Sequence, residues 1–155
     1  MKIKILWPGR TKNAAIRALE EYYLERIQGL ASCQVIPTPA ARGLEERFAK
    51  KIIEIEAEGL EKHFKDEYIV CLIDAGQEMN SREFAGFLER RAAASPKGVT
   101  FVAGGFLGLA SRVLERANLR LSLSRMTLSH ELCRAVLMEQ LYRSLSIMKG
   151  RPYAK

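Results

Sequence analysis

The sequence predicts an α/β fold in which helices flank a five-stranded, largely parallel sheet. Strand-like and helix-like segments alternate along all 155 residues, which is typical of sheets built from strand–helix–strand units. The runs YIVCLID and GVTFVA are apolar without alternation, as expected for strands that helices cover on both faces. The length fits one domain spanning residues 1–155.

In the first half of the chain, cap and turn residues mark the ends of the expected elements. Pro8-Gly9 ends the first strand, Asn13 caps the first helix and Gly29 ends it. The second helix carries many charges but keeps a stripe of apolar residues. The expected elements are a strand at 2–7, a helix at 13–29, a strand at 33–37, a helix at 44–64 and a strand at 68–74.

In the second half, Asn80 or Ser81 caps the third helix. The glycine turn AGGFLG follows a buried strand and leads into a short helix, and LRLSLS alternates like a half-buried strand. The expected elements are a helix at 82–95, a strand at 98–103, a helix at 109–117, a strand at 119–124 and a helix at 131–150.

The charge balance favours a polyanionic partner without requiring one. Lys and Arg total 25 against 18 Asp and Glu, which gives a net charge of +7. Small basic proteins often bind RNA or DNA, but a basic surface that serves only solubility is equally consistent with these numbers.

Cysteine and histidine usage argues for a cytosolic protein without a metal site. Cys33, Cys71 and Cys133 form no C-x-x-C and lie in apolar segments, so we expect reduced, mostly buried thiols. His63 and His130 are too few and too isolated for zinc. The N-terminus lacks a signal-peptide core, and no apolar run approaches the roughly 20 residues of a membrane span.

Three loops are expected to meet at one edge of the sheet. Ligands of open α/β sheets bind beyond the carboxyl ends of the strands. The segments DAGQEMN, GGFLG and RMTLSH each follow the carboxyl end of a predicted strand. If those strands are neighbours, the three segments wall one pocket.

The glycine turn does not match a phosphate-binding motif. Gly104, Gly105 and Gly108 form G-G-x-x-G, which is neither the dinucleotide fingerprint nor a P-loop. No Lys or Arg lies within the loop to hold a phosphate. The remaining interpretations are a tight turn that binds nothing and a turn that lets a ligand approach the backbone closely.

The C-terminal third carries the other candidate site residues. His130 and Arg134 lie at i, i+4 on one helix face, where His130 is either a catalyst or a capping or surface residue. The last helix is apolar over most of its circumference, which indicates a central helix or a subunit interface. Arg151 and Tyr153 suit phosphate contact and base stacking, although chain ends are usually solvated.

Taken together, these segments resemble the SPOUT-class methyltransferases that methylate a pseudouridine of 23S ribosomal RNA at ring position 3. The resemblance covers the chain from MKIKIL to RPYAK. Its landmarks are CLIDAGQEMNSREFA, FVAGGFLGL, LSLSRMTLSHELCRAVLMEQLYRSLSIMKG and the terminal Pro152-Tyr153. The combination in this order is far more specific than the glycines alone.

The resemblance implies a C-terminal deep trefoil knot, a homodimer through the C-terminal helix and S-adenosylmethionine as methyl donor. The substrate would be ribosomal RNA, with the assembled ribosome as one form of it, in the cytoplasm. By position, Gly105 and Gly108 would shape the turn. The donor would be bound by Leu72, Gly104, Leu123, Ser124, Arg125, Met126, Thr127 and Leu128. The residues expected to face RNA are Arg134, Tyr142, Arg151 and Tyr153.

Position and chemistry suggest roles for two of these residues. His130 is the candidate base that removes the ring proton, with water as the alternative, and Arg134 would stabilise the resulting anion. This chain departs from the family pattern at Ile73, where an acid is usual, and at Ser129, where proline is usual; Phe106-Leu107 is also more apolar. The competing interpretations are a non-catalytic RNA- or nucleotide-binding α/β protein and an enzyme that holds a phosphorylated metabolite.

Overall fold

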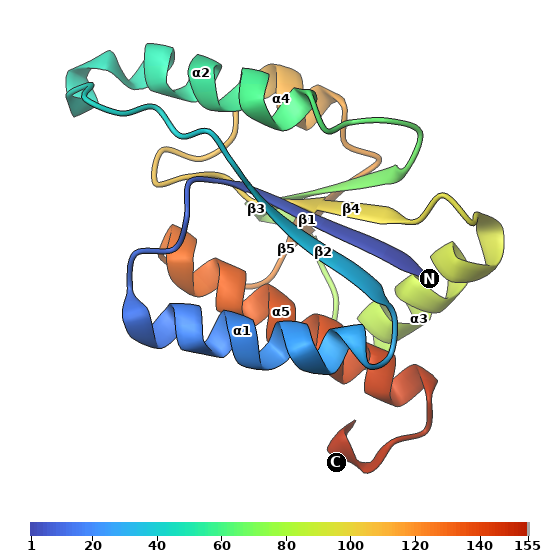
Figure 1. Cartoon of the computed structure of the whole chain (residues 1–155). Helices are drawn as coiled ribbons and strands as arrows, with labels where there is room; N and C mark the ends of the chain where they lie inside the picture. Colours follow the sequence, from blue (N-terminus) through green and yellow to red (C-terminus); the bar gives the residue numbers. More distant parts are fainter. Residues whose placement is uncertain (155) are drawn as a thin grey trace.

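The computed structural model describes residues 1–154, and the expected alternation of strands and helices is confirmed (Figure 1). The strands are β1 (Lys2–Pro8), β2 (Ser32–Thr38), β3 (Tyr68–Glu78), β4 (Val99–Val102) and β5 (Leu119–Ser122). The α-helices are α1 (Ala14–Gln28), α2 (Ala49–Glu61), α3 (Ser81–Ala94), α4 (Ser111–Glu115) and α5 (His130–Met148). The 3₁₀ turns are η1 (Glu46–Phe48) and η2 (Pro152–Ala154).

The five strands form one parallel sheet in the order β2-β1-β4-β3-β5. The register aligns Ile5 of β1 with Val35 of β2 and with Phe101 of β4. This order places β3 between β4 and β5. The carboxyl ends of these three strands, from which the three candidate loops leave, are therefore neighbours.

Helices cover both faces of the sheet, as the apolar strands predicted (Figure 1). On one face, α1, α3 and α5 pack against Ile5, Phe101 and other fully buried strand residues. On the other face, α2 and α4 cover a smaller cluster that includes Leu6 and Cys71. Because side chains alternate along a strand, Ile5 and its neighbour Leu6 enter opposite cores.

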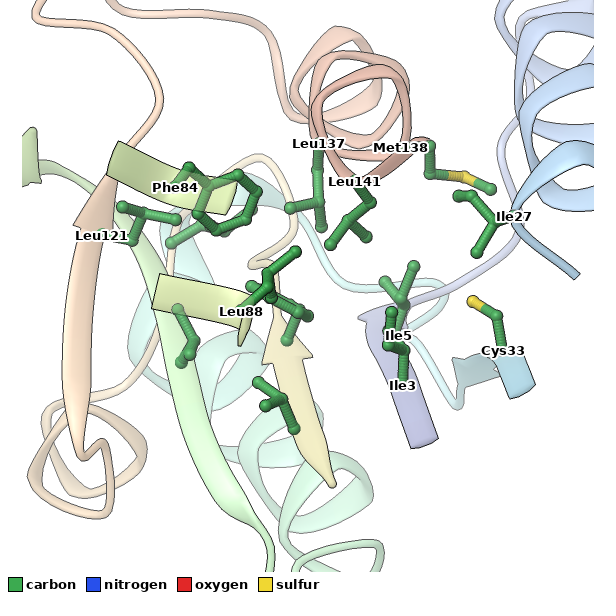
Figure 2. Packing of buried hydrophobic residues seen from close by; sticks show 14 of the residues in the cluster. Ile3, Ile5, Ile27, Cys33, Phe84, Leu88, Leu121, Leu137, Met138 and Leu141 are labelled. Carbon is green, nitrogen blue, oxygen red and sulfur yellow. The ribbon is translucent and has the colours of Figure 1, made fainter. Parts of the chain in front are cut away.

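Helix α5 occupies the middle of its layer. It packs between α1 and α3, and Leu137 and Leu141 project from it into the core beside Phe84 of α3 (Figure 2). All three side chains are at most 3% exposed. Burial within the chain thus accounts for much of the apolar surface of α5, which had also suggested a subunit interface. Leu132 of this helix remains 41% exposed.

Two caps predicted from the sequence are present, and Ser129 supplies a third. Asn13 accepts from the amides of Ala15 and Ile16, Ser129 accepts from the amide of Leu132, and Asn80, rather than Ser81, caps α3. Asn80 and Glu83 form a reciprocal capping box. None of these bonds depends on distant parts of the chain.

Several element boundaries differ from the expectation. The strand expected at 68–74 continues to Glu78, so most of the segment DAGQEMN is strand and not loop. The helix expected from residue 44 begins as the 3₁₀ turn η1 and becomes α-helical only at Ala49, without a side-chain cap at its start. The last strand ends at Ser122 instead of 124. The reason is a local turn in which the Ser122 hydroxyl donates to the Ser124 carbonyl and the Met126 amide donates to Ser124 Oγ, both at 3.0 Å.

Strand β3 runs past β5 with a shift in register. Leu72 pairs with Leu121, and so does Gln77 five residues later. Between them, Gly76 lies so close to β5 that a Cβ there would be 2.7 Å from the Leu121 carbonyl carbon. Only glycine allows this approach of two backbones.

Candidate donor site

The three segments do meet, and they line a cavity of about 370 Å³ at the carboxyl edge of the sheet. The first segment, DAGQEMN, contributes only Asp74, because β3 continues to Glu78 instead of giving way to a loop. The walls of the cavity are residues Leu72 to Asp74 within β3, the β4–α4 turn from Ala103 to Leu109, and the β5–α5 segment. Leu114 of α4 and His130 and Cys133 of α5 complete the lining. The volume falls within the roughly 300–1,000 Å³ of ligand pockets.

Most of the residues expected to bind a donor line this cavity, and Arg125 does not. Arg125 is exposed and points outside the lining. The lining includes Leu72, Gly104, Gly105, Gly108, Leu123, Ser124, Met126, Thr127 and Leu128. Arg125 lies in the tight turn after β5, between the lining residues Ser124 and Met126.

The close packing of the β4–α4 turn requires glycine. A Cβ at Gly104 would lie 2.6 Å from the carbonyl carbon of Gly108. Gly108 has a φ of +83° and donates from its amide to the carbonyl of Gly105 at 3.0 Å. The turn therefore needs glycine to fold back on itself, and the same lack of side chains exposes its backbone to the cavity.

His130 borders the cavity at the first turn of α5. Burial disfavours the imidazolium and lowers the His130 pKa from its ordinary value of 6.5, and the nearby Arg134 charge lowers it further. Glu131 acts in the opposite direction. The net result is a neutral imidazole at neutral pH, which can accept a proton.

The cavity is not built for an anion. Its lining contains one acid, Asp74, and none of the Lys or Arg residues within the described 154 positions. The Asp74 carboxylate accepts the Ala75 amide at 2.8 Å. In a chain with a net charge of +7, this choice of residues disfavours a phosphate and suits a ligand that carries positive charge.

The expectation that Arg134 faces RNA or the reacting base needs correction. Arg134 is 1% exposed and is absent from the lining, although it shares a helix face with His130. Its guanidinium donates to the Pro8 carbonyl at 2.8 Å and to Thr11 Oγ1 at 2.9 Å, and it lies 4.9 Å above the Trp7 ring. Arg134 therefore holds the β1–α1 loop and is a positioning residue.

Glu131 also forms hydrogen bonds to the β1–α1 loop. Its carboxylate accepts the amides of Lys12 at 2.7 Å and Asn13 at 3.0 Å. These bonds lower the Glu131 pKa. Together, Glu131 and Arg134 form a latch between the β1–α1 loop and the first turns of α5, where His130 lies.

The C-terminal candidates lie at the far end of α5. Tyr142 and Tyr153 pack with ring centroids 4.6 Å apart, and the Tyr153 hydroxyl donates to Glu139 at 3.2 Å. Burial raises the pKa of Tyr153, and Arg151 is exposed. At about 1.5 Å per residue, Tyr142 is roughly 18 Å along α5 from His130, so these side chains do not line the same chain's cavity.

Comparison with known proteins agrees with this architecture. A family model described as "Predicted SPOUT methyltransferase" matches residues 1–154. The chain belongs to the SPOUT methyltransferase family. It is therefore a methyltransferase, and its cavity lies where the three motifs of the resemblance converge.

Named relatives of this SPOUT methyltransferase match it from end to end. The "Ribosomal RNA large subunit methyltransferase H" of Bacillus thuringiensis subsp. konkukian is 40% identical over 161 aligned positions, which cover 100% of both chains. The protein of that name from Enterococcus faecalis is 37% identical over 160 positions, again covering 100% of both.

Solved structures share the fold at low sequence identity. A "Probable Methyltransferase" from Bordetella pertussis Tohama I has a TM-score of 0.58 at 15% identity, covering 93% of this chain and 96% of the other. A probable methylase family protein from Haemophilus influenzae has a TM-score of 0.55 at 14% identity, covering 99% of this chain and 70% of the other. These likenesses support the fold alone.

Sequence reasoning missed one buried acid next to the site. Glu56 of α2 is 6% exposed and lies behind Gly105. Its spacing from Ile52 and Leu60, four residues on either side, places it on the buried stripe of the helix. The sequence feature that could have identified Glu56 is a charged residue in the middle of the apolar stripe of this helix.

Proposed function

We propose that this SPOUT methyltransferase, acting as a single domain, methylates N3 of a pseudouridine in 23S ribosomal RNA, on the assembled large subunit or ribosome. The observation that carries the proposal is the cavity at the carboxyl edge of the sheet that is lined by both a neutral His130 and the glycine turn. The full-length relatives named as large-subunit ribosomal RNA methyltransferases support the substrate class.

The residues of the cavity fit S-adenosylmethionine. Leu72 and other leucines offer an apolar wall for an adenine ring, and Gly104 and Gly105 allow close approach to the backbone. The absence of Lys and Arg from the lining within residues 1–154 suits a donor with a sulfonium and an ammonium group. When bound, this donor supplies an electrophilic methyl group.

The chain's own residues would then position the base and remove its proton. His130 accepts the N3 proton, because its imidazole is neutral and next to the cavity. The Glu131–Arg134 latch fixes the turn of α5 that carries His130. Correct orientation contributes roughly 7–11 kcal/mol to lowering such barriers, and a general base adds about 10²–10⁴-fold.

A homodimer and a knotted C-terminal segment belong to the same proposal. Leu19 and Tyr22 of α1 and Leu132 of α5 are 41–45% exposed on two helices that pack side by side (Figure 1), and a second copy would cover them. The match to the SPOUT family over residues 1–154 supports the knot.

In the dimer, the C-terminal residues of one protomer would contact RNA at the cavity of its partner. Tyr142, Arg151 and Tyr153 offer aromatic faces and a positive charge, and within one chain they lie at the opposite end of α5 from His130. A ribosomal substrate places the enzyme in the cytoplasm. Within residues 1–154, no helix is long and apolar enough to cross a membrane.

Two measurements test the proposal. Calorimetry with S-adenosylmethionine should show binding to the purified protein. A methylation assay should compare naked 23S ribosomal RNA, isolated large subunits and whole ribosomes, with the modified nucleotide mapped by mass spectrometry. A folded protein that binds RNA but no methyl donor would instead be a non-catalytic RNA-binding protein.

A further inference from the structure

Glu56 is a buried acid with a side-chain oxygen that finds no hydrogen-bond partner in the described part of the chain. The side chain is 6% exposed, and its Oε2 atom is buried without a hydrogen-bond partner among residues 1–154. Leaving a charged acceptor unsatisfied away from water is costly. A buried acid in this state therefore requires an explanation beyond packing.

The carboxylate stands directly behind the glycine wall of the cavity. A Cβ on Gly105 would lie 2.9 Å from Glu56 Oε2 and 3.2 Å from Oε1, and Gly105 itself lines the cavity. Because Gly105 has no side chain, only its backbone separates the Glu56 charge from the space that a ligand would occupy.

Glu56 forms no ion pair with a cation among the described residues. Arg134 is the charged group that acts on Glu56, and it opposes the rise in the Glu56 pKa that burial causes. Yet the same guanidinium also interacts with Glu20 and Glu131, and it donates to Pro8 and Thr11. Three carboxylates thus share one guanidinium, and Asp74 adds a further acid to the lining.

We propose that Glu56 determines the preference of this site for a positively charged donor over its uncharged product. This inference rests on the proposed function. Methyl transfer breaks the bond between sulfonium and methyl and forms the bond from methyl to N3, while the N3 proton goes to the base. The sulfonium becomes a neutral thioether, so the attraction to Glu56 is lost with the methyl group and product release is favoured.

Binding of three ligands to the purified full-length protein would test this role. S-adenosylmethionine carries the sulfonium, S-adenosylhomocysteine is the neutral thioether, and sinefungin carries an amine at the same place. In calorimetry, Glu56→Gln should weaken the two cationic ligands by about threefold to tenfold. S-adenosylhomocysteine should bind within about twofold of its wild-type affinity, so the ratio between donor and product falls.

Two further variants control for structure. Glu58→Gln changes an exposed acid on the same helix and should leave all three affinities unchanged. Glu56→Asp keeps the charge and should keep the preference for the cationic ligands. It also allows the test to proceed if Glu56→Gln fails to fold, in which case loss of the preference in Glu56→Asp would overturn the inference.

The outcomes separate this inference from the proposed function. If the wild-type protein binds none of the three ligands, the proposed methyltransferase site is wrong. If the wild-type protein binds them and Glu56→Gln changes all three affinities equally, or none, the Glu56 inference is wrong while the donor site stands.

Discussion

Arg134, in the second turn of α5, donates a hydrogen bond of 2.8 Å to the carbonyl oxygen of Pro8, the last residue of β1. Together with the bond to Thr11, it holds the β1–α1 loop against the helix that carries His130. A buried guanidinium that spans two elements in this way is part of the framework of the site.

Removing this guanidinium should destabilise the protein. Because Arg134→Ala leaves Glu20 and the Pro8 carbonyl without their buried partner, we expect a loss of about 3–5 kcal/mol in the free energy of unfolding. Urea denaturation would measure it. Arg125→Ala, which removes an exposed arginine nearby, should change stability by less than about 0.5 kcal/mol. Equal effects of the two changes would contradict the latch.

His130→Ala should slow methyl transfer with little effect on donor affinity. The imidazole borders the cavity and is neutral at neutral pH, so its loss should reduce turnover by about 10²–10⁴-fold. Single-turnover kinetics and calorimetry would separate the two quantities. The matched control is His63→Ala, which changes the other histidine of the chain. Wild-type turnover in His130→Ala would leave water as the proton acceptor.

The pH dependence of the reaction should report the same imidazole. Burial lowers the His130 pKa below 6.5, so kcat/KM should rise with pH through a midpoint below that value and level off above it. The unfolded chain binds the proton more tightly, so the contribution of this group to stability is lost as pH falls below 6.5. A midpoint above 6.5 would argue against His130 as the base.

Gly104→Ala should disrupt donor binding. Its Cβ would lie 2.6 Å from the Gly108 backbone, and the turn would have to open. We expect at least a tenfold loss of affinity for S-adenosylmethionine in calorimetry. Gly86→Ala provides the control, since its Cβ would meet only the end of the flexible Arg90 side chain, at 3.3 Å. Normal binding by Gly104→Ala would place the donor elsewhere.

Leu132→Glu should dissociate the proposed dimer. A carboxylate in an apolar contact between copies is strongly unfavourable, so analytical ultracentrifugation should show a shift to monomer. Phe48→Glu changes a side chain of similar exposure, 43% against 41%, on the opposite face of the sheet, and should leave the assembly intact. A wild-type protein that sediments as a monomer would refute the dimer itself.

The sequence was sufficient for features that depend on local chemistry. Asn13 and the pair Asn80 or Ser81 could be identified as caps because a cap bonds to amides two or three residues away. The meeting of the three loops was also predictable, because the carboxyl ends of neighbouring parallel strands lie at one edge. Only the adjacency of β3, β4 and β5 had to come from the structure.

Features that depend on distant partners were not predictable in the same way. Arg134 shares the helix face of His130 at i, i+4. Its partners, however, are Pro8 at the end of β1 and Thr11 in the following loop, more than 120 residues earlier. The proposed role of Glu56 likewise depends on its proximity to Gly105, which is distant in sequence and close only in the folded chain. Helical spacing identifies a shared face, while burial depends on what the rest of the chain places against it.

The latch between the β1–α1 loop and α5 also has a consequence for biosynthesis. Its bonds join residues 118 to 126 positions apart, so they form only after nearly the whole chain is available. The N-terminal strands can begin to pair during synthesis, but the base-bearing turn cannot be fixed until α5 has been translated and released. A nascent or prematurely terminated chain would thus lack an assembled catalytic centre, and activity would appear only with the completed protein.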